Sequence, residues 1–268
     1  MTAAFPEAME RFRKDYAKQR ASEGRAYSGA ELATLPYLDS GPLARQWAVR
    51  ARTFDAIQRL AVRPLAKELR RPLGVLDLGA GNGWLSYRLA GEGHACTAID
   101  IREDSVDGLG KASGLARRRF FTRLVASFEA LPLPDACADV AAFNAALHYS
   151  TDLQQALSEA VRCVRKGGLI AILDSPFYRR AADGAAMVAE KRRLATQRFE
   201  GRAASLLALP HVEYVTRESL REASQPLGLA WARHRVRYPL WYELRPVAAF
   251  ARGARAPSRF DLWTARVR

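Results

Sequence analysis

The chain has 268 residues, of which 49% are hydrophobic and 26% are charged, and these proportions are typical of a folded domain with a sizeable core. The 42 basic residues outnumber the 28 acidic ones by 14, which makes nucleic acid or another anionic surface the first partner to consider. No apolar run reaches the roughly 18 residues of a membrane-spanning helix, so we expect no membrane partner.

The cysteines and the N-terminus bear on the cellular compartment. Cys96, Cys137 and Cys163 are odd in number and show no metal-ligand spacing, so we expect neither a zinc site nor a disulfide framework. The first residues, MTAAFPEAMERFRKDYAKQR, are charged throughout and lack the apolar stretch of a signal peptide. The sequence therefore favours a cytoplasmic protein.

Residues 1–72 are predicted to form an N-terminal helical cap. In residues 44–69 (ARQWAVRARTFDAIQRLAVRPLAKEL), apolar side chains such as Trp47 and Phe54 recur near helical spacing. The preceding stretch, YSGAELATLPYLDSGP, is rich in Pro and Gly and predicts a loop or a short cap.

Residues 73–175 alternate strand and helix signals. Strand-like runs are GVLDLG, HACTAID, FFTRLVAS, ADVAAFNAAL and GGLIAILDS, and helices are predicted through WLSYRLAGEG and DLQQALSEAVRCVRKGG. We expect the second of these helices to end at its glycines. Alternating strands and helices predict an α/β fold, in which a parallel sheet is covered on both faces.

The remaining residues divide into two parts. Residues 176–215 are predicted to form a helical lid inserted after the fifth strand, and they include the basic helix AAMVAEKRRLATQRFEG. Residues 216–268 are predicted to complete the sheet through the runs LAWARHRVRY and RFDLWTARV. Thr216 and Ser219 are candidate helix caps.

The segment VLDLGAGNGWLSYRLA, residues 75–90, carries the strongest functional signal. An apolar strand ends in Asp77, a glycine-rich loop follows, and a helix begins after it. Glycines allow the backbone to turn sharply and approach a ligand, and the helix N-terminus offers free N–H groups. Asp100 closes the next strand, where an acid can accept hydrogen bonds from both hydroxyls of a ribose.

The glycine spacing separates two classes of nucleotide-binding protein. The dinucleotide fingerprint GxGxxG is not met, because Trp84 and Ser86 stand where its third glycine would be. The spacing is GxGxG, with an acid two residues before the first glycine. This pattern resembles motif I of the class I S-adenosylmethionine-dependent methyltransferases.

The resemblance extends through residues 70–175. SFEALPLPDACADVAAFNAALHY is similar to the family's stretch from the adenine-binding loop into the fourth strand, and LSEAVRCVRKGGLIAILDS is similar to the helix and fifth strand that follow. It implies the family's Rossmann-like fold, a mainly parallel seven-stranded sheet with helices on both faces. It also implies that S-adenosyl-L-methionine is the cofactor.

The same resemblance implies which residues hold the cofactor. They are Asp77, Gly79, Ala80, Gly81, Asn82, Gly83, Asp100, Ile101, Ser127, Phe128, Asn144 and Arg50. Ser127 stands where many family members have Asp, so the adenine amino group could be read by Ser127, by the Phe128 backbone or by Glu129. Arg50 could clamp the methionine carboxylate through bidentate pairing, and a solvated helix face is the alternative. The candidate cap contacts are Tyr16, Tyr27, Tyr37, Trp47 and Arg50.

The residues after the fourth and fifth strands are expected to surround the transferred methyl group. His148 is the candidate base, because an imidazole titrates near neutrality, and a structural histidine is the alternative. Tyr149 and Tyr178 could contact the acceptor or pack in the core. Asp174 could bind the acceptor or cap a helix.

The positive charge lies outside the predicted cofactor core. Residues 1–72 carry a net +6, residues 73–175 a net −2 and residues 176–268 a net +10. One cluster, on the predicted lid helix, comprises Lys191, Arg192, Arg193 and Arg198. Neither the Asn- or Asp-Pro-Pro-Tyr motif of amino-methylating DNA enzymes nor the Pro-Cys of the cytosine type is present at its place, so nucleic acid is not favoured as the partner.

We therefore predict a methyltransferase that acts on a small-molecule acceptor by in-line displacement of the sulfonium methyl. An anionic acceptor would suit the charge of the flanking segments. Three alternatives stay open: another use of the cofactor, such as ring closure or transfer of its aminocarboxypropyl arm; an RNA or DNA methyltransferase; and an inactive cofactor-binding partner subunit. The oligomeric state is left open.

Overall fold

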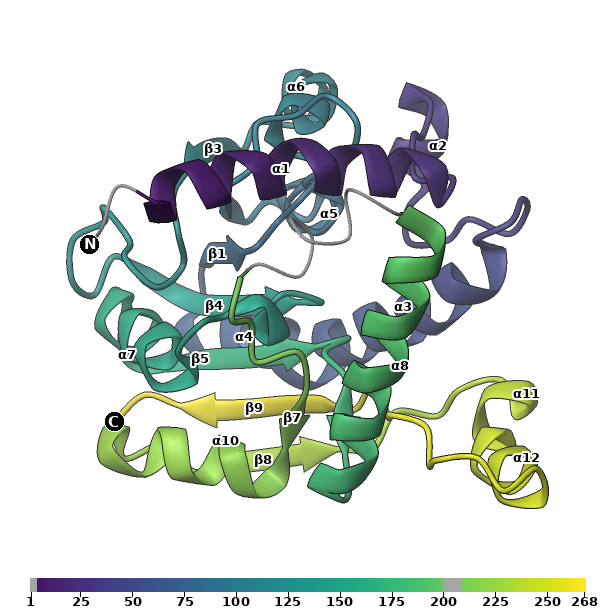
Figure 1. Cartoon of the computed structure of the whole chain (residues 1–268). Coiled ribbons are helices and arrows are strands. Elements are labelled where there is room, and N and C mark those ends of the chain that lie inside the picture. Colours follow the sequence, from purple (N-terminus) through teal and green to yellow (C-terminus); the bar gives the residue numbers. More distant parts are fainter. Residues whose placement is uncertain (1–3, 200–208) are drawn as a thin grey trace.

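The computed structural model describes residues 4–199 and 209–268, and a seven-stranded sheet lies at the centre of this part of the chain (Figure 1). Its strands are β1 (Gly74–Leu78), β2 (Ala95–Asp100), β3 (Thr122–Val125), β4 (Ala138–Asn144), β5 (Val164–Leu173), β8 (Trp231–His234) and β9 (Leu262–Arg266). The order across the sheet is β3-β2-β1-β4-β5-β9-β8. The first five strands are parallel, and β9 runs antiparallel to both of its neighbours. The predicted fold class is confirmed.

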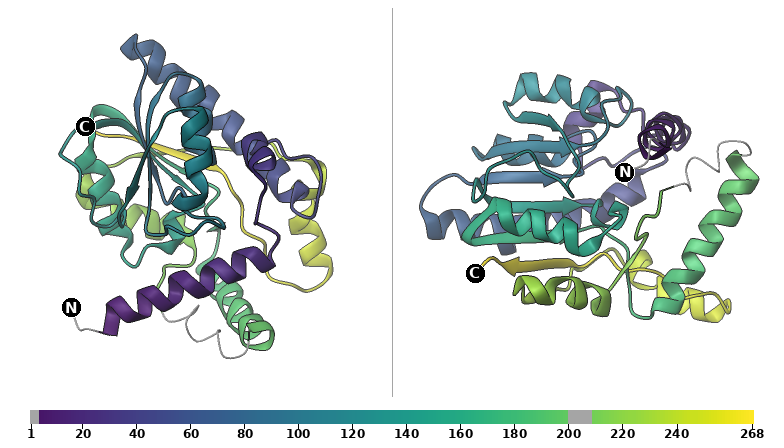
Figure 2. Two further views of the ribbon diagram at one scale, coloured as in Figure 1. Left: turned by 90° about the horizontal axis from the view of Figure 1, so that it is seen from above. Right: turned by 60° about the vertical axis from the view of Figure 1, so that its left-hand side comes forward.

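Helices cover both faces of the sheet (Figure 2). One face carries α3 (Ala44–Ile57), α4 (Arg63–Leu69), α5 (Trp84–Gly91) and α6 (Leu109–Arg118), and the other carries α7 (Leu153–Cys163) and α10 (Arg217–Ser224). Side chains alternate along β1, so that Val75 enters the first core while Leu76 and Leu78 enter the second. Because both faces are buried, the central strands are apolar throughout.

Helix α7 ends earlier than predicted. It stops at Cys163, and Val164 is already extended and begins β5. The two glycines that were expected to end the helix lie inside the β5 segment. A Cβ at Gly168 would stand 2.5 Å from the backbone oxygen of Asp139, so glycine is needed there for the close approach of β4 rather than for a helix cap.

The cap differs from its prediction in two details. The Pro- and Gly-rich stretch contains a short helix, α2 (Gly29–Thr34), which begins at a capping box between Ser28 and Glu31. Between α3 and α4 the chain forms a π-helical turn, η1 (Gln58–Val62), next to Pro64. Proline has no N–H to donate to the preceding turn, which accounts for the altered pairing at this position. The caps predicted at Thr216 and Ser219 are confirmed, since they form the capping box of α10.

Two helices lie at the carboxyl ends of the parallel strands. Figure 2 shows α1 (Ala4–Ser22) and α8 (Ala181–Phe199) at the same end of the sheet. Strand β6 (Phe177–Tyr178) pairs with β7 (Val215–Thr216), so the two ends of the inserted segment meet. Residues 200–208 of the predicted lid and the Arg198 side chain lie outside the described residues. In the described part of the chain, no helix combines the length and apolarity needed to cross a membrane.

Asp139 is a buried carboxylate that joins three segments at the opposite end of the sheet. It accepts hydrogen bonds from the Gly74 N–H and from the side chains of Arg71 and Arg165. Burial alone would raise the pKa of Asp139, but these hydrogen bonds lower it to about 2.

We expect Asp139→Asn to lower the free energy of unfolding by about 3 kcal/mol at neutral pH, because it breaks a buried ion pair. A carboxylate whose pKa is lowered by folding stabilises the protein above its unfolded pKa. The difference between wild type and variant should therefore shrink as the pH falls from about 4 towards 2. Urea unfolding at several pH values measures it, and a difference that is independent of pH would contradict this role.

Candidate active site

The loop between β1 and α5 depends on glycines. Gly79, Gly81 and Gly83 have φ angles of 73°, 54° and 75°, in the region that other residues rarely adopt. The N–H groups of Gly79 and Ala80 both donate to the backbone oxygen of Ile99, at 2.8 and 2.9 Å. A Cβ at Gly79 would lie only 2.4 Å from the Cβ of Ala146. The loop is therefore held against β2 and against the loop that follows β4.

Asp100 ends β2 directly beside this loop. One carboxylate oxygen accepts from the Gly81 N–H at 2.8 Å, and the other accepts from the Arg102 N–H at 2.9 Å. Burial raises the pKa of Asp100, while the charge of Arg102 and these hydrogen bonds oppose the rise. The carboxyl group is thus fixed in orientation by two backbone donors.

A cavity of about 430 Å³ opens above the loop, at the carboxyl ends of β1, β2 and β4. The expected cofactor residues on its wall are Gly79, Ala80, Gly81, Asn82, Asp100, Ile101, Ser127, Phe128, Asn144 and Arg50. Tyr149 also borders it, and Tyr16 reaches it from the cap. The structure thus brings together most of the positions that were expected to hold the cofactor.

Asp77 and Gly83 lie beneath the loop and are not on the cavity wall. Oδ2 of Asp77 accepts from the N–H and the hydroxyl of Ser86, so it fixes the first turn of α5, and burial raises the pKa of Asp77 to about 7. Oδ1 of Asp77 is buried and has no hydrogen-bond partner. A Cβ at Gly83 would lie 2.9 Å from that of Ala112 on α6. Both residues shape the loop from below.

Arg50 reaches the cavity from α3. Its guanidinium carbon lies 5.0 Å from the centre of the Trp47 ring, and no carboxylate of the described residues forms an ion pair with it. Burial, followed by the positive charge of Arg25, lowers the pKa of Arg50. A partly buried guanidinium without an acidic partner is a favourable place for an anionic group of a ligand.

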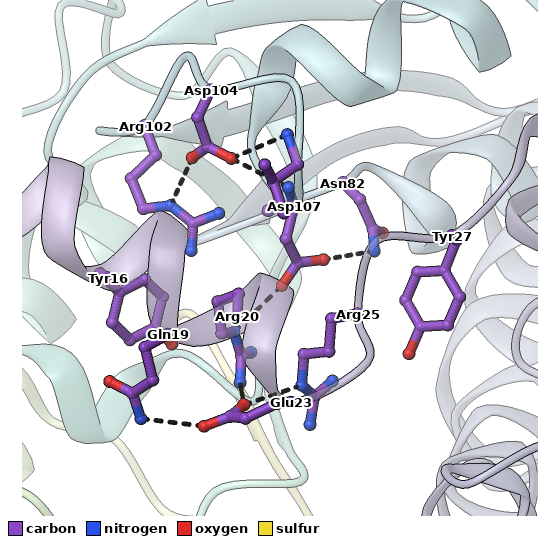
Figure 3. A network of polar contacts seen from close by, with 12 residues as sticks. Tyr16, Gln19, Arg20, Glu23, Arg25, Tyr27, Asn82, Arg102, Asp104 and Asp107 are labelled. Carbon is purple, nitrogen blue, oxygen red and sulfur yellow. Dashed lines mark hydrogen bonds and ion pairs between the residues drawn. The ribbon is translucent and has the colours of Figure 1, made fainter. Parts of the chain in front are cut away.

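The cap is tied to the glycine loop by a polar network (Figure 3). The Arg20 side chain donates to Asp107 at 3.1 Å, and Asp107 also accepts from the Asn82 amide at 2.7 Å. The hydroxyls of Tyr16 and Tyr149 are 2.8 Å apart. These contacts join α1 to the loops after β1, β2 and β4, so α1 closes one side of the cavity.

The sequence analysis did not identify several polar residues on the cavity wall, among them Arg20, Arg25, Arg102 and Asp107. No motif marks them, because they meet only through the packing of α1 on the loop after β2. Conversely, Tyr27, Tyr37 and Trp47 do not line the cavity. Trp47 is buried and donates to the Tyr27 hydroxyl at 2.7 Å, while Tyr37 is half-exposed and donates to Asp55.

The three candidates for contact with adenine are now distinguishable. The Glu129 carboxylate accepts from the Thr151 hydroxyl and from the backbone N–H groups of Thr151 and Asp152, so it already holds the loop before α7. The Ser127 hydroxyl accepts from the Glu129 N–H at 3.1 Å. Ser127, Phe128 and Glu129 all border the cavity, and Ser127 and Phe128 remain the candidates because the Glu129 carboxylate is already engaged.

A second cavity, of about 380 Å³, lies on the other side of Tyr149. Three of the expected catalytic residues, His148, Tyr149 and Tyr178, line it. Because Tyr149 borders both cavities, they are neighbours across one side chain. Cationic side chains on the second wall come from α8 (Lys191), from α12 (Arg245) and from the segment after α12 (Arg255).

His148 was favoured as a base because an imidazole ordinarily titrates near neutrality, but the pKa of His148 at this site is far lower. Burial, followed by the positive charge of Lys191, lowers the pKa of His148 to about 3, so the ring is neutral at ordinary pH. Its Nδ1 atom is buried and has no hydrogen-bond partner, and its ring centre lies 4.3 Å from that of Tyr149. A neutral imidazole can orient an acceptor, but it is a weak proton acceptor at this pKa.

Asp174 lines neither of these two cavities. It follows β5 with a φ angle of 50° and is only 6% exposed. Burial raises the pKa of Asp174 to about 6, while Arg50 and Thr53 oppose the rise. Its Oδ1 atom is buried and has no hydrogen-bond partner.

The fold and the glycine loop are those of the Rossmann-like class I methyltransferases. Residues 76–172 match the family model described as a methyltransferase domain. This segment runs from within β1 almost to the end of β5 and includes the glycine loop and Asp100. Residues 76–172 therefore carry a methyltransferase domain of the kind that uses S-adenosylmethionine as its cofactor.

The relatives with curated names carry the same kind of domain. A malonyl-[acyl-carrier protein] O-methyltransferase of Pseudescherichia vulneris is 36% identical over 126 residues, which are 45% of this chain and 48% of that protein. The ubiquinone/menaquinone biosynthesis C-methyltransferase UbiE of Acidiphilium cryptum is 38% identical over 96 residues, 35% of this chain and 39% of that protein. The chain spans about half the length of the curated relatives it matches, or less.

A solved structure matches over the full chain. It is the 1,6-didemethyltoxoflavin-N1-methyltransferase of Burkholderia thailandensis with bound 1,6-didemethyltoxoflavin and S-adenosylhomocysteine. The TM-score is 0.56 at 19% identity, and the match covers 100% of this chain and 92% of the other. At this identity the likeness shows the fold.

In the described part of the chain, no cluster of three or more His, Cys, Asp or Glu side chains could hold a metal ion.

Proposed function

We propose that this chain is an S-adenosylmethionine-dependent methyltransferase that acts on a small-molecule acceptor. The observation that carries the proposal is the pair of cavities separated by Tyr149, one walled by the glycine loop and Asp100 and the other by the residues after β4 and β5. When bound, S-adenosylmethionine supplies a methyl group on a sulfonium, and its thioether is a good leaving group. The protein then has mainly to bind and orient both molecules.

Three features of the larger cavity fit this cofactor. Asp100, fixed by two backbone donors, keeps lone pairs that can accept from ribose hydroxyls. Gly79 lets the loop pack closely against Ala146 in a conformation that keeps the loop on the cavity wall. Arg50 offers a guanidinium without an acidic partner to the methionine carboxylate.

The charge of the smaller cavity supports an anionic acceptor. Lys191 pairs with Glu213 at 2.6 Å, and Arg255 pairs with Glu190 at 2.8 Å. Arg245 forms no ion pair with a carboxylate of the described residues, and its Nε is buried without a partner. A carboxylate or phosphate of the acceptor would give the Arg245 guanidinium the acidic partner that it lacks. The hydroxyl of Tyr149 and the neutral ring of His148 would then orient the acceptor next to the larger cavity.

Product analysis tests the proposed reaction. The chain is incubated with S-adenosylmethionine alone, with a small-molecule extract of cells, and with total RNA. We expect S-adenosylhomocysteine to form only with the small-molecule extract. Methylthioadenosine formed from the cofactor alone would indicate ring closure instead, and methylation of RNA only would contradict a small-molecule acceptor.

Arg50→Ala tests the clamp on the methionine carboxylate. We expect it to weaken S-adenosylhomocysteine binding about 10- to 100-fold, because one charge-assisted pairing is lost. Binding of methylthioadenosine, which lacks the carboxylate, should be unchanged. Arg52→Ala, on the exposed side of the same helix, is the matched control. Calorimetry measures both ligands, and an equal loss for the two would contradict this role of Arg50.

A further inference from the structure

A group of exposed apolar side chains lies on α11 (Leu240–Glu243) and α12 (Arg245–Ala251). Eleven large hydrophobic side chains are exposed in the described residues, and five of them fall between positions 240 and 250. They are Leu240 (79% exposed), Trp241 (38%), Leu244 (56%), Val247 (65%) and Phe250 (87%). We call these five side chains the α11–α12 face. Such a concentration marks an interaction site rather than ordinary surface.

The two helices are anchored by their other side. Tyr242 and Ala249 are buried, and Tyr242 contacts the rings of Tyr238 and Phe260. Val247 and Phe250 are three residues apart in α12 and so share one side of it, while Leu240 and Trp241 lie on α11 and Leu244 lies between the two helices. Figure 1 shows α11 and α12 at the edge of the molecule, away from the central sheet. The face is thus an apolar ridge held firmly on the fold.

The surroundings of this face are strongly basic. Residues 231–260 contain seven arginines and a single acidic residue, Glu243. Arg45, Arg237 and Arg252 are exposed, and none of them forms an ion pair with a carboxylate of the described residues. The guanidinium of Arg45 lies 5.7 Å from the centre of the Trp241 ring. The ridge is therefore flanked by positive charge that the protein itself does not neutralise.

We propose that the α11–α12 face docks onto an anionic lipid bilayer. Exposed Leu, Trp and Phe side chains flanked by arginines are the composition of helices that lie in the membrane interface. A second copy of the chain would bring two arginine clusters together, which the charge disfavours. A bilayer admits a protruding apolar ridge without a complementary groove. The expectation of no membrane partner rested on the lack of a spanning segment, and it does not bear on surface docking.

Docking in this way would orient the proposed enzyme. Arg245, on α12, also lines the smaller cavity. The face and the cavity thus belong to adjoining parts of the structure, and binding through α11 and α12 would bring the cavity close to the lipid surface. Lipid binding itself does not require methyl transfer, so the two proposals can fail separately.

Vesicle flotation tests the docking surface. The full chain is mixed with vesicles of phosphatidylcholine and phosphatidylglycerol in equal parts, or of phosphatidylcholine alone. We expect binding to the anionic vesicles only, and we expect Leu240→Glu together with Phe250→Glu to weaken it about tenfold or more. Phe120→Glu is the matched control, because Phe120 is 86% exposed but lies outside this face. The control should bind like the wild type.

A second double variant separates the contribution of charge to vesicle binding from the contribution of apolar contact. Arg237→Glu with Arg252→Glu should weaken binding and reduce its dependence on salt, while circular dichroism checks that each variant is folded. The proposal is overturned if the wild type does not bind anionic vesicles, or if the Leu240 and Phe250 variant binds as the wild type does. It is also overturned if the wild type is a dimer that this variant dissociates, since a second copy would then occupy the face.

Discussion

Gly79→Ala is expected to abolish detectable S-adenosylhomocysteine binding and to destabilise the fold. A Cβ at this position would lie 2.4 Å from the Cβ of Ala146, and the φ angle of 73° is unfavourable for alanine. Strain and overpacking together should lower the free energy of unfolding by about 2–4 kcal/mol. The loop must move away from Ala146, which displaces the backbone that would approach the cofactor. Calorimetry and thermal unfolding measure the two effects.

Gly93→Ala is the control for backbone strain. Gly93 has a φ angle of 92°, and a Cβ there would meet no atom within 4 Å. We expect it to lower the stability by about 1–2 kcal/mol and to leave ligand affinity unchanged. If Gly79→Ala binds S-adenosylhomocysteine as tightly as Gly93→Ala does, the loop does not hold the cofactor as proposed.

Asp100→Ala is expected to weaken S-adenosylhomocysteine binding about 100-fold or more. The variant removes the carboxylate that would accept from the ribose hydroxyls, and hydrogen bonds to a charged acceptor are each worth about 1.5–3 kcal/mol. It also leaves the N–H groups of Gly81 and Arg102 without their acceptor. Asp100→Asn keeps the size of the side chain but not the charge, and we expect an intermediate loss.

A ligand lacking both ribose hydroxyls separates the two contributions. The wild type should bind this dideoxy analogue of S-adenosylhomocysteine much more weakly than the natural ligand. Asp100→Ala should show little difference between the two ligands, because the partner of the hydroxyls is gone. An equal preference for the natural ligand in both proteins would mean that Asp100 does not contact the ribose.

The sequence was most informative where local patterns decide the structure. The apolar runs of β1 to β5 and the GxGxG loop indicate the fold and the place of the larger cavity, because strand ends and glycine turns follow from neighbouring residues. The α7 boundary was wrong for the opposite reason. Glycine is needed at position 168 because the backbone of Asp139 approaches it closely, and these two residues are distant in sequence.

The parts of the site that could not be predicted depend on tertiary packing. Arg20 and Asp107 meet only because α1 folds over the loop after β2. The pKa of His148 depends on burial and on Lys191 from another helix, so its ordinary value near neutrality misled the choice of base. Ser127 and Phe128 remain predictions for adenine contact, as do the other cofactor residues, because each needs a bound ligand to test it.

The structure also shows which of the basic side chains behind the net charge of +14 are in ion pairs. Many of the basic side chains are in ion pairs, including Arg71 and Arg165 with Asp139, and Arg259 with Glu243. Basic residues outside these ion pairs include Arg237 and Arg252 near α11 and α12, and Lys111, Arg117 and Arg118 on α6.

The most direct test of the central claim is a calorimetric titration of the wild-type chain with S-adenosylhomocysteine. The arrangement of the glycine loop, Asp100 and Arg50 around one cavity predicts saturable binding at a single site. The binding should be lost in Gly79→Ala and retained in Gly93→Ala. If the folded wild-type chain does not bind S-adenosylhomocysteine, the assignment of this cavity to the cofactor is wrong.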